Sequence, residues 1–340
     1  MIPPSLSIQV KSCEAPARPP WRKQLQAGWR SPQALLKHLS IEPQTIDWMD
    51  DSPFPMRVPQ AFSQRMRSGD ARDPLLRQVL PVRLEADTLD GFSADPVGDL
   101  ASRNERGLLH KYRGRVLLIT TGACAIHCRY CFRRDFPYAS EHTSPSHWAP
   151  AIDYIAEHDD ISEVILSGGD PWMLSTQRLQ ALSDRLSRIP HIRRLRIHTR
   201  MPITLPDRIN SSLMSWLQSL PWQTVVVVHA NHANEFDHHV ERALDQLRRA
   251  GAQVFNQAVL LAGVNDDIDS LTQLMERSFA AGAIPYYLHL LDRVQGSAHF
   301  EVGEPRALEL MQAMRERLSG YLVPRLVREQ SGAAYKLPVF

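Results

Sequence analysis

After Gly107 the chain alternates short apolar runs with stretches of helical pattern, and this alternation constrains the fold more than any other feature. Six runs rich in β-branched residues occur, at residues 116–121, 164–167, 195–199, 224–229, 254–260 and 284–290. Segments such as 150–158 and 238–250 carry helical patterns between them. Strands that alternate with helices pair in parallel, so the pattern predicts an α/β fold with a parallel sheet. Chemistry in such folds gathers where the strands end.

Three of the four cysteines follow the first of these runs, as Cys124, Cys128 and Cys131 in a C-x3-C-x2-C array. Thiolates this close together are good soft ligands for an iron–sulfur cluster or for zinc. A four-iron cluster needs a ligand on each iron, so three cysteines leave one iron open to another molecule. Zinc with His127 as fourth ligand is the alternative. It would require the adjacent His127 and Cys128 to bind one ion with little backbone between them.

A C-x3-C-x2-C array on a loop after a hydrophobic strand resembles the fingerprint of the radical S-adenosylmethionine (SAM) family. That resemblance implies a [4Fe-4S] cluster, SAM bound at the open iron, an external electron donor and a partial (β/α)6 barrel. It also implies that an electron from the cluster cleaves SAM to a 5′-deoxyadenosyl radical. The segment Ser167-Gly-Gly-Asp170 is similar to the family's GGE motif. Gly168, Gly169 and Asp170 are therefore expected to bind the SAM amino group, with Asp one methylene shorter than Glu; an ordinary strand-to-helix turn is the alternative.

The sequence before Gly107 differs from the rest in its pattern of prolines and apolar residues. Residues 1–20 contain five prolines and are expected to form a flexible tail. Residues 21–106 show apolar residues at helical spacing and are expected to form an N-terminal helical domain, with the radical SAM core at 107–340.

The 39 Lys and Arg residues nearly balance the 37 Asp and Glu residues, which gives no case for nucleic-acid binding. No apolar run is long enough to span a membrane, and we expect a cytoplasmic protein.

Several further segments resemble lysine 2,3-aminomutase, a radical SAM enzyme that also carries pyridoxal 5′-phosphate (PLP). The matching segments are His110-Lys-Tyr-Arg-Gly-Arg115, Asn256-Gln-Ala-Val-Leu-Leu261, Gly263-Val-Asn-Asp266, Pro285-Tyr-Tyr-Leu288 and Tyr335-Lys-Leu-Pro338. In that family PLP is carried on a lysine near the end of the catalytic domain. The resemblance implies that Lys336 carries PLP, that Tyr112 and Arg115 contact its phosphate and that Gln257 lies beside it. On the residues alone, Lys336 would be an ordinary solvated lysine.

The same resemblance implies how L-lysine is recognised. Arg133 corresponds to the arginine that binds the substrate carboxylate, a task that suits its planar guanidinium. Asp292 and Glu329 correspond to two carboxylates that hold the ε-ammonium, although the family has Asp at the second position. A surface arginine and a structural salt bridge are the alternatives. The implied reaction takes a hydrogen from Cβ of L-α-lysine, moves the amino group from Cα to Cβ with the help of PLP and gives β-lysine.

The carboxyl end indicates a branch of the family. Clostridial aminomutases continue beyond the PLP lysine into a cysteine-bearing, zinc-binding segment, whereas this sequence stops four residues after Lys336 and has Asp267 where they have a further cysteine. It resembles the branch that makes (R)-β-lysine for the ligase that modifies translation elongation factor P. The alternatives are a free-standing lysine or glutamate 2,3-aminomutase and a catalytically silent binding protein. Against the silent protein stand the intact cysteines, Arg133 and Lys336.

Overall fold

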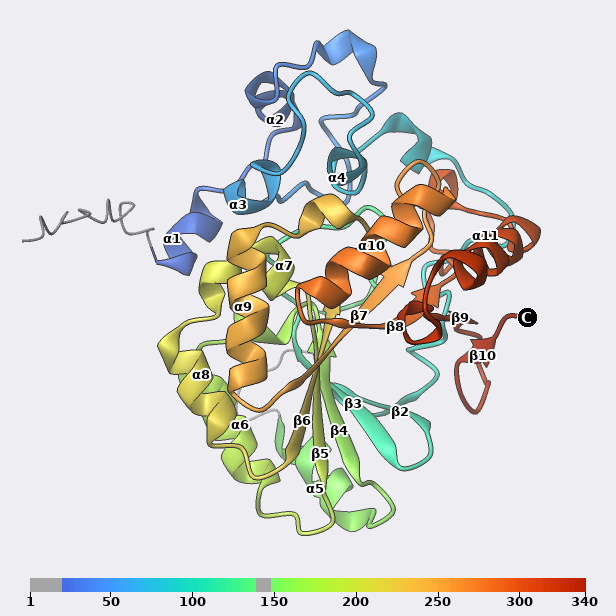
Figure 1. The fold of residues 1–340 in the computed structure, drawn as a ribbon. Helices are drawn as coiled ribbons and strands as arrows, with labels where there is room; N and C mark the ends of the chain where they lie inside the picture. Colours follow the sequence, from blue (N-terminus) through green and yellow to red (C-terminus); the bar gives the residue numbers. More distant parts are fainter. Residues whose placement is uncertain (1–19, 139–147) are drawn as a thin grey trace, which may run out of the picture.

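One ten-stranded sheet organises the computed structural model, which describes residues 20–138 and 148–340 (Figure 1). The strands lie side by side in sequence order. Seven pair in parallel: β3 (Arg115–Thr121), β4 (Glu163–Gly168), β5 (Arg194–Thr199), β6 (Gln223–His229), β7 (Gln253–Val259), β8 (Ile284–His289) and β9 (Arg325–Arg328). Antiparallel strands extend both edges: β1 (Arg103–Glu105), β2 (Leu108–Tyr112) and β10 (Leu337–Pro338). Within the described ranges β1 and β10 do not pair, so the sheet is an open barrel.

Helices connect the parallel strands in the order that the sequence predicts. They are α5 (Ala149–Glu157), α6 (Thr176–Leu186), α7 (Met201–Thr204), α8 (Ser211–Gln218), α9 (His238–Arg249), α10 (Ile268–Ala280) and α11 (Glu304–Arg317). Helix α9 shows why they form: the Asp237 side chain caps its first turn, and Val240, Ala243, Leu244 and Leu247 place one apolar stripe in the core. None of the described helices is long and apolar enough to cross a membrane.

The predicted partial barrel is confirmed, and all six predicted runs form the parallel strands β3 to β8. The sheet holds one more parallel strand than predicted, because β9 follows β8 in parallel. Strand β9 has only two apolar residues, Leu326 and Val327, between arginines, so it gave no recognisable run. The predicted tail and Cys13 lie outside the described residues, apart from Pro20.

The amino-terminal segment forms a hydrophobic cluster separate from that of the barrel. It contains the short helices α1 (Trp21–Gln26), α2 (Pro32–His38), α3 (Gln60–Ser63) and α4 (Pro74–Arg77). Leu35, Phe62 and Leu76 are fully buried in this cluster, and Ile126 of the cysteine loop is buried with them. The segment therefore packs directly on the loop that carries the three cysteines.

Candidate active site

A cavity of about 1200 Å³ opens at the carboxyl ends of the parallel strands. Every residue that the sequence marks for the site lines it, although these residues span 225 positions from Tyr112 to Lys336. They are Tyr112, Arg115, Cys124, Cys128, Cys131, Arg133, Gly168, Gly169, Asp170, Gln257, Asp292, Glu329 and Lys336. Most of these residues lie at or after the carboxyl ends of parallel strands, which meet at one edge of the sheet, whereas Tyr112 and Arg115 lie at the amino end of β3.

The cysteine loop follows β3 and is fixed by the amino-terminal segment. The Arg57 guanidinium donates to the Cys124 carbonyl at 2.9 Å, and the Arg129 amide donates to the Gln78 carbonyl at 2.9 Å. The Arg129 side chain is fully buried and its Nε lies 2.8 Å from the Glu85 carboxylate. Backbone and side-chain bonds together hold the loop in one conformation.

The three cysteines are free thiols, and their surroundings fit an iron–sulfur cluster better than zinc. Zinc needs ligands that converge on one ion. Among the described residues no three His, Cys, Asp or Glu side chains converge in that way. The proposed fourth zinc ligand, His127, places its Nδ1 2.6 Å from the Pro55 carbonyl and stacks on Phe54. In a four-iron cube each cysteine binds a different iron, so the sulfurs need not converge on one point.

Burial and mutual repulsion disfavour the thiolates unless a cation is bound. Burial, with the neighbouring sulfurs and Asp170, raises the pKa of Cys124. Burial and Cys128 raise the pKa of Cys131 to about 11. A cationic cluster core would offset both effects, since metal ligation requires the thiolate.

The two glycines after β4 let the cysteine loop approach closely. Gly168 has φ +120°, and a Cβ there would lie 2.5 Å from the Thr121 carbonyl oxygen. A Cβ on Gly169 would lie 2.5 Å from the Ala123 carbonyl oxygen. The backbone of this segment therefore lies against the residues that lead into Cys124.

The carboxylate of Asp170 has partners within the protein. Its Oδ1 accepts from the Trp172 amide at 3.0 Å and from the Thr199 hydroxyl at 2.8 Å, while Oδ2 accepts from the Arg200 amide at 2.7 Å. Burial raises its pKa to about 6, against the lowering effect of these bonds. The side chain thus ties the end of β4 to the end of β5. Three donors of the protein thus hold this carboxylate, and its role toward the SAM amino group stays a prediction.

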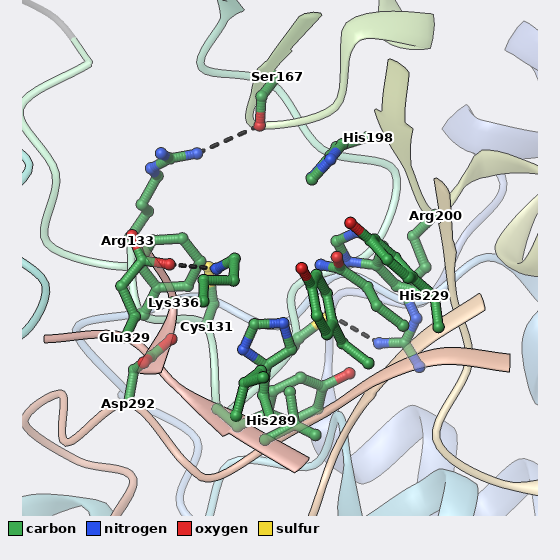
Figure 2. A pocket seen from close by; sticks show the side chains of 18 of the residues that line it. Cys131, Arg133, Ser167, His198, Arg200, His229, His289, Asp292, Glu329 and Lys336 are labelled. Atoms are coloured by element: carbon green, nitrogen blue, oxygen red, sulfur yellow. Dashed lines mark hydrogen bonds and ion pairs between the residues drawn. The ribbon is translucent and has the colours of Figure 1, made fainter. Parts of the chain in front are cut away.

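A row of alternating charges crosses the opposite part of the cavity, and Figure 2 shows its two ends, Arg133 and the pair of Lys336 with Glu329. Lys336 forms an ion pair with Glu329. Lys111 contacts Glu329 at 3.3 Å and Asp99 at 2.6 Å, and Asp99 accepts from Nε of Arg133 at 2.6 Å. The row joins the predicted carboxylate-binding arginine to the predicted ammonium-binding glutamate.

Asp99 and Lys111 were not predicted as site residues. Lys111 lies in the segment His110–Arg115 that carries the family resemblance, but its pairing depends on contacts with residues far along the chain. Asp99 precedes the sheet in a segment with no pattern that indicates a buried charge, yet it is 2% exposed. Only the tertiary structure brings the two residues together.

Asp292 and Glu329 have opposite electrostatic environments. Burial raises the pKa of Asp292 to about 7, although the Lys336 ammonium opposes the shift. Burial alone would also raise the pKa of Glu329, but Lys336 and Lys111 outweigh it and lower the pKa to about 2. Glu329 is therefore a stable anion, whereas Asp292 lacks enough positive charge around it. A further cation beside Asp292 would stabilise the ionised form of its carboxylate.

Arg133 is buried, and two of its nitrogens are engaged. Its Nε donates to Asp99, and its Nη1 donates to the Ser167 hydroxyl at 3.2 Å (Figure 2). Neither bond uses Nη2. The guanidinium is thus oriented by protein groups at the edge of the cavity, as a site for a carboxylate requires.

Tyr112 and Arg115 face each other across the turn between β2 and β3. The Arg115 guanidinium lies 4.7 Å from the centroid of the Tyr112 ring. Burial and the nearby Glu329 raise the pKa of Tyr112, so its hydroxyl remains a hydrogen-bond donor. The pair offers a cation and a donor to an anionic group in the cavity.

Five buried polar atoms of residues that line the cavity have no partner among the described residues: Nε2 of His198, His229 and His289, Oε1 of Gln257 and Nε of Arg200. These residues lie at or near the carboxyl ends of β5, β6, β8 and β7 (Figure 2 labels the histidines). Burial lowers the pKa of all three histidines, that of His229 to about 3, so they are neutral. Unpaired buried polar atoms are costly, which indicates that a polar ligand completes the site. No motif in the sequence marks these histidines, although each lies at or next to the end of a strand.

Comparisons with known proteins agree with this geometry. Residues 118–275 match the Radical SAM superfamily. L-lysine 2,3-aminomutase of Escherichia coli (strain K12) is 43% identical over 333 residues, which cover 97% of this chain and 97% of that protein. The L-lysine 2,3-aminomutase of Haemophilus influenzae is 42% identical, with 93% of this chain and 94% of that protein covered. That of Clostridium subterminale is 31% identical, with 94% and 77% covered.

The predicted resemblance is thus confirmed, both for the superfamily and for the group within it. Similarity at this level over nearly the whole chain exceeds what a shared fold alone would give. The chain belongs to the radical SAM superfamily and, within it, to the lysine 2,3-aminomutase family of isomerases.

Proposed function

We propose that the protein converts L-α-lysine into (R)-β-lysine with a [4Fe-4S] cluster, SAM and PLP. The observation that carries the proposal is one cavity that joins a cysteine triplet to a lysine beside two carboxylates, with an oriented arginine between them. Each part alone has an ordinary structural explanation. Their convergence matches a reaction that needs a radical, a carrier for an amino group and two ends of a charged substrate.

The cluster with SAM supplies a radical that abstracts hydrogen, and PLP supplies a conjugated carrier through which the amino group moves. The cluster would be held by Cys124, Cys128 and Cys131. The backbone of Gly168 and Gly169 would face the SAM amino group, because the Asp170 carboxylate is already bonded within the protein. Lys336 would carry PLP, with Tyr112 and Arg115 at its phosphate and Gln257 beside it.

The charges favour lysine over glutamate as the substrate. Arg133 would bind the α-carboxylate of either amino acid. At the far end Glu329 is an anion and Asp292 is an anion only when a cation compensates it, so an ε-ammonium is stabilised there. The side-chain carboxylate of glutamate would face two carboxylates. A glutamate aminomutase is therefore the weaker candidate.

Lys336 forms an ion pair with the Glu329 carboxylate in this structure. If Lys336 carries PLP, its nitrogen would no longer pair with Glu329, and one oxygen of that carboxylate would become available. The substrate ammonium can then take its place, while Lys111 continues to hold the other oxygen. Binding of PLP would thus prepare the substrate site.

We further propose that the product serves the ligase that modifies elongation factor P. The 43% identity with the Escherichia coli relative exceeds the 31% identity with the clostridial relative, in agreement with the branch that the sequence resembles. A metabolic supply of free β-lysine is the second candidate. Mass spectrometry of elongation factor P from cells with and without the gene distinguishes them, since only the first role predicts loss of a β-lysyl adduct.

The activity itself is tested by anaerobic turnover. Reconstituted protein with SAM, PLP and dithionite, which replaces the external electron donor, is given lysine or glutamate. Chiral chromatography should find (R)-β-lysine from lysine and no product from glutamate. Preferred turnover of glutamate would overturn the substrate assignment, and absence of both products would overturn the proposed activity.

A further inference from the structure

The three cysteine sulfurs have unequal surroundings. Nη1 of Arg200 lies 2.7 Å from Sγ of Cys128. Near Cys131, the Arg133 guanidinium donates to Asp99 and Ser167 instead of to a sulfur. At Cys124 the nearby guanidinium, that of Arg57, donates to the backbone carbonyl. Cys128 therefore carries the strongest charge-assisted donor.

The Arg200 guanidinium is held on two sides by buried groups. Arg200 directly follows β5 and is 6% exposed (Figure 2). Its Nη2 donates to Oε1 of Gln78 at 2.7 Å and to Oε2 of Glu235 at 2.8 Å. Both partners are fully buried. The guanidinium is thus oriented toward the cysteine loop by the amino-terminal segment and by the turn after β6.

Glu235 is itself fixed. Its Oε1 accepts from the Asn231 amide at 2.8 Å and from Nε2 of Gln78 at 3.1 Å. A buried carboxylate this well bonded offsets the charge of Arg200 without displacing it. Arg200 therefore offers one N–H donor to the Cys128 sulfur, while Glu235 reduces the net positive charge of the pair.

Donors to a cluster sulfur act mainly on the reduced state. One-electron reduction adds negative charge to the cluster and its sulfurs, so a hydrogen bond to sulfur becomes stronger and the potential rises. We propose that Arg200 is a positioning residue that raises the reduction potential of the cluster through Cys128, and that Glu235 limits the size of this effect. The inference rests on the cluster of the proposed function, and it is independent of PLP and lysine.

The proposal predicts shifts of opposite sign for two variants. Glu235→Gln removes the anion and one of its two acceptor oxygens, while Nη2 of Arg200 keeps its bond to Oε1 of Gln78. The positive charge of Arg200 is then less offset, so the potential should rise. Arg200→Met combined with Glu235→Gln removes the donor without leaving an unpaired buried charge, so the potential should fall. We expect a change of about tenfold in the reduction equilibrium for the double variant, which is about 59 mV for one electron.

The experiment is an anaerobic titration with dithionite as the reductant, in which electron paramagnetic resonance follows the reduced cluster. Wild type, both variants and a matched pair, Arg196→Met with Glu163→Gln, are compared at equal iron content. Arg196 and Glu163 also form a partly buried ion pair, and Arg196 borders the same cavity. The matched pair should leave the potential unchanged, because neither residue contacts a cysteine sulfur in this structure. SAM binding is measured in parallel.

Opposite shifts in the two variants, with an unchanged matched pair, support the proposal. An unchanged potential in the double variant at full iron content overturns it, as does a loss of SAM binding without a shift, which would mean that Arg200 acts on SAM. If the double variant does not assemble a cluster, the sign of the Glu235→Gln shift decides, and a fall or no shift overturns the proposal. A wild type that takes up no iron would instead refute the cluster and with it the proposed function.

Discussion

The cysteine end and the lysine end of the cavity are organised differently. At the cysteine end the amino-terminal segment covers the loop, and buried arginines there have buried carboxylate partners, as in Arg129 with Glu85 and Arg200 with Glu235. At the lysine end Lys336 lies just before β10 on the edge of the sheet and is partly exposed. Asp292 there is half-buried, and the positive charge around it does not offset the desolvation that raises its pKa.

This difference indicates that the two ends need their ligands to different degrees. The cysteine loop is held in place by protein contacts before any cluster binds. The lysine end holds an ion pair, Lys336 with Glu329, that must break for the proposed reaction, and a carboxyl group that needs another cation. We therefore expect loss of a cysteine to remove function outright, and changes of the two carboxylates at the lysine end to alter both activity and stability.

The largest expected effect is that of Cys128→Ala. Removing one of three ligands should abolish cluster assembly and all turnover, while the barrel still folds because the loop is fixed by contacts such as Arg57 with the Cys124 carbonyl. Iron analysis and circular dichroism measure the two properties. Undiminished iron and turnover in this variant would show that the array does not hold the cluster.

Lys336→Ala should abolish the attachment of PLP at the lysine end of the cavity and leave the cysteine end unaffected. We expect loss of the borohydride-reducible PLP adduct and of turnover, with iron content and SAM binding unchanged, because separate parts of the chain hold the two cofactors. The control is Lys37→Ala, at an exposed position in the last turn of α2. Recovery of the labelled adduct on Lys111 would show that the assignment of the PLP lysine is wrong.

Asp292→Asn should have an intermediate effect on activity. Loss of a charged hydrogen bond to the ε-ammonium is expected to lower kcat/KM for lysine roughly ten- to a hundredfold. Asp269→Asn, at an exposed carboxylate on α10, is the matched control. The assay compares initial rates at several lysine concentrations under anaerobic conditions. An Asp292→Asn variant as active as the wild type would exclude this carboxylate from substrate binding.

The smallest expected effects concern stability, and they should have opposite signs at the two carboxylates. The pKa of Asp292 is raised to about 7, so stability falls as pH rises from the ordinary pKa of an aspartate toward 7, and it stays at that lower level at higher pH. The pKa of Glu329 is lowered to about 2, so its ionised form stabilises the fold above its ordinary pKa, and that stability is lost as pH falls toward 2.

At pH 8 without cofactors, Asp292→Asn should therefore increase the free energy of unfolding and Glu329→Gln should decrease it. Each change is expected to be about 1–3 kcal/mol, the range for a buried charged group that gains or loses its compensation. Urea unfolding followed by circular dichroism measures both. Shifts of the same sign would contradict the electrostatic account of the lysine end.

The six-stranded parallel core could be predicted because the runs that form β3 to β8, although short, are mostly apolar and alternate with helical patterns. Strand β9 could not, because its two apolar residues become a strand only by pairing with β8. The individual site residues came from short segments shared with a known family. Those segments could not predict which side chains contact each other, because the contacts join residues far apart in sequence. Examples are Asp99 with Arg133, Lys111 with Glu329 and Arg200 with Cys128.

Asp170 illustrates the same limit. Its place in the motif was evident from sequence, but its carboxylate is used by Thr199 and the Arg200 amide, which only the folded chain brings near. The neutral histidines at the strand ends were overlooked because a histidine after an apolar run is common in any buried sheet. Their unpaired Nε2 atoms become informative only when the cavity around them is known.

The central claim is that both ends of the cavity act on one lysine molecule, and transfer of an isotope between them tests it most directly. Lysine carrying deuterium at Cβ is turned over anaerobically, and mass spectrometry measures deuterium in the recovered SAM and in β-lysine. The account predicts deuterium in both, because the hydrogen taken from Cβ passes through the 5′ carbon of the SAM fragment. Formation of β-lysine with unlabelled SAM would contradict it.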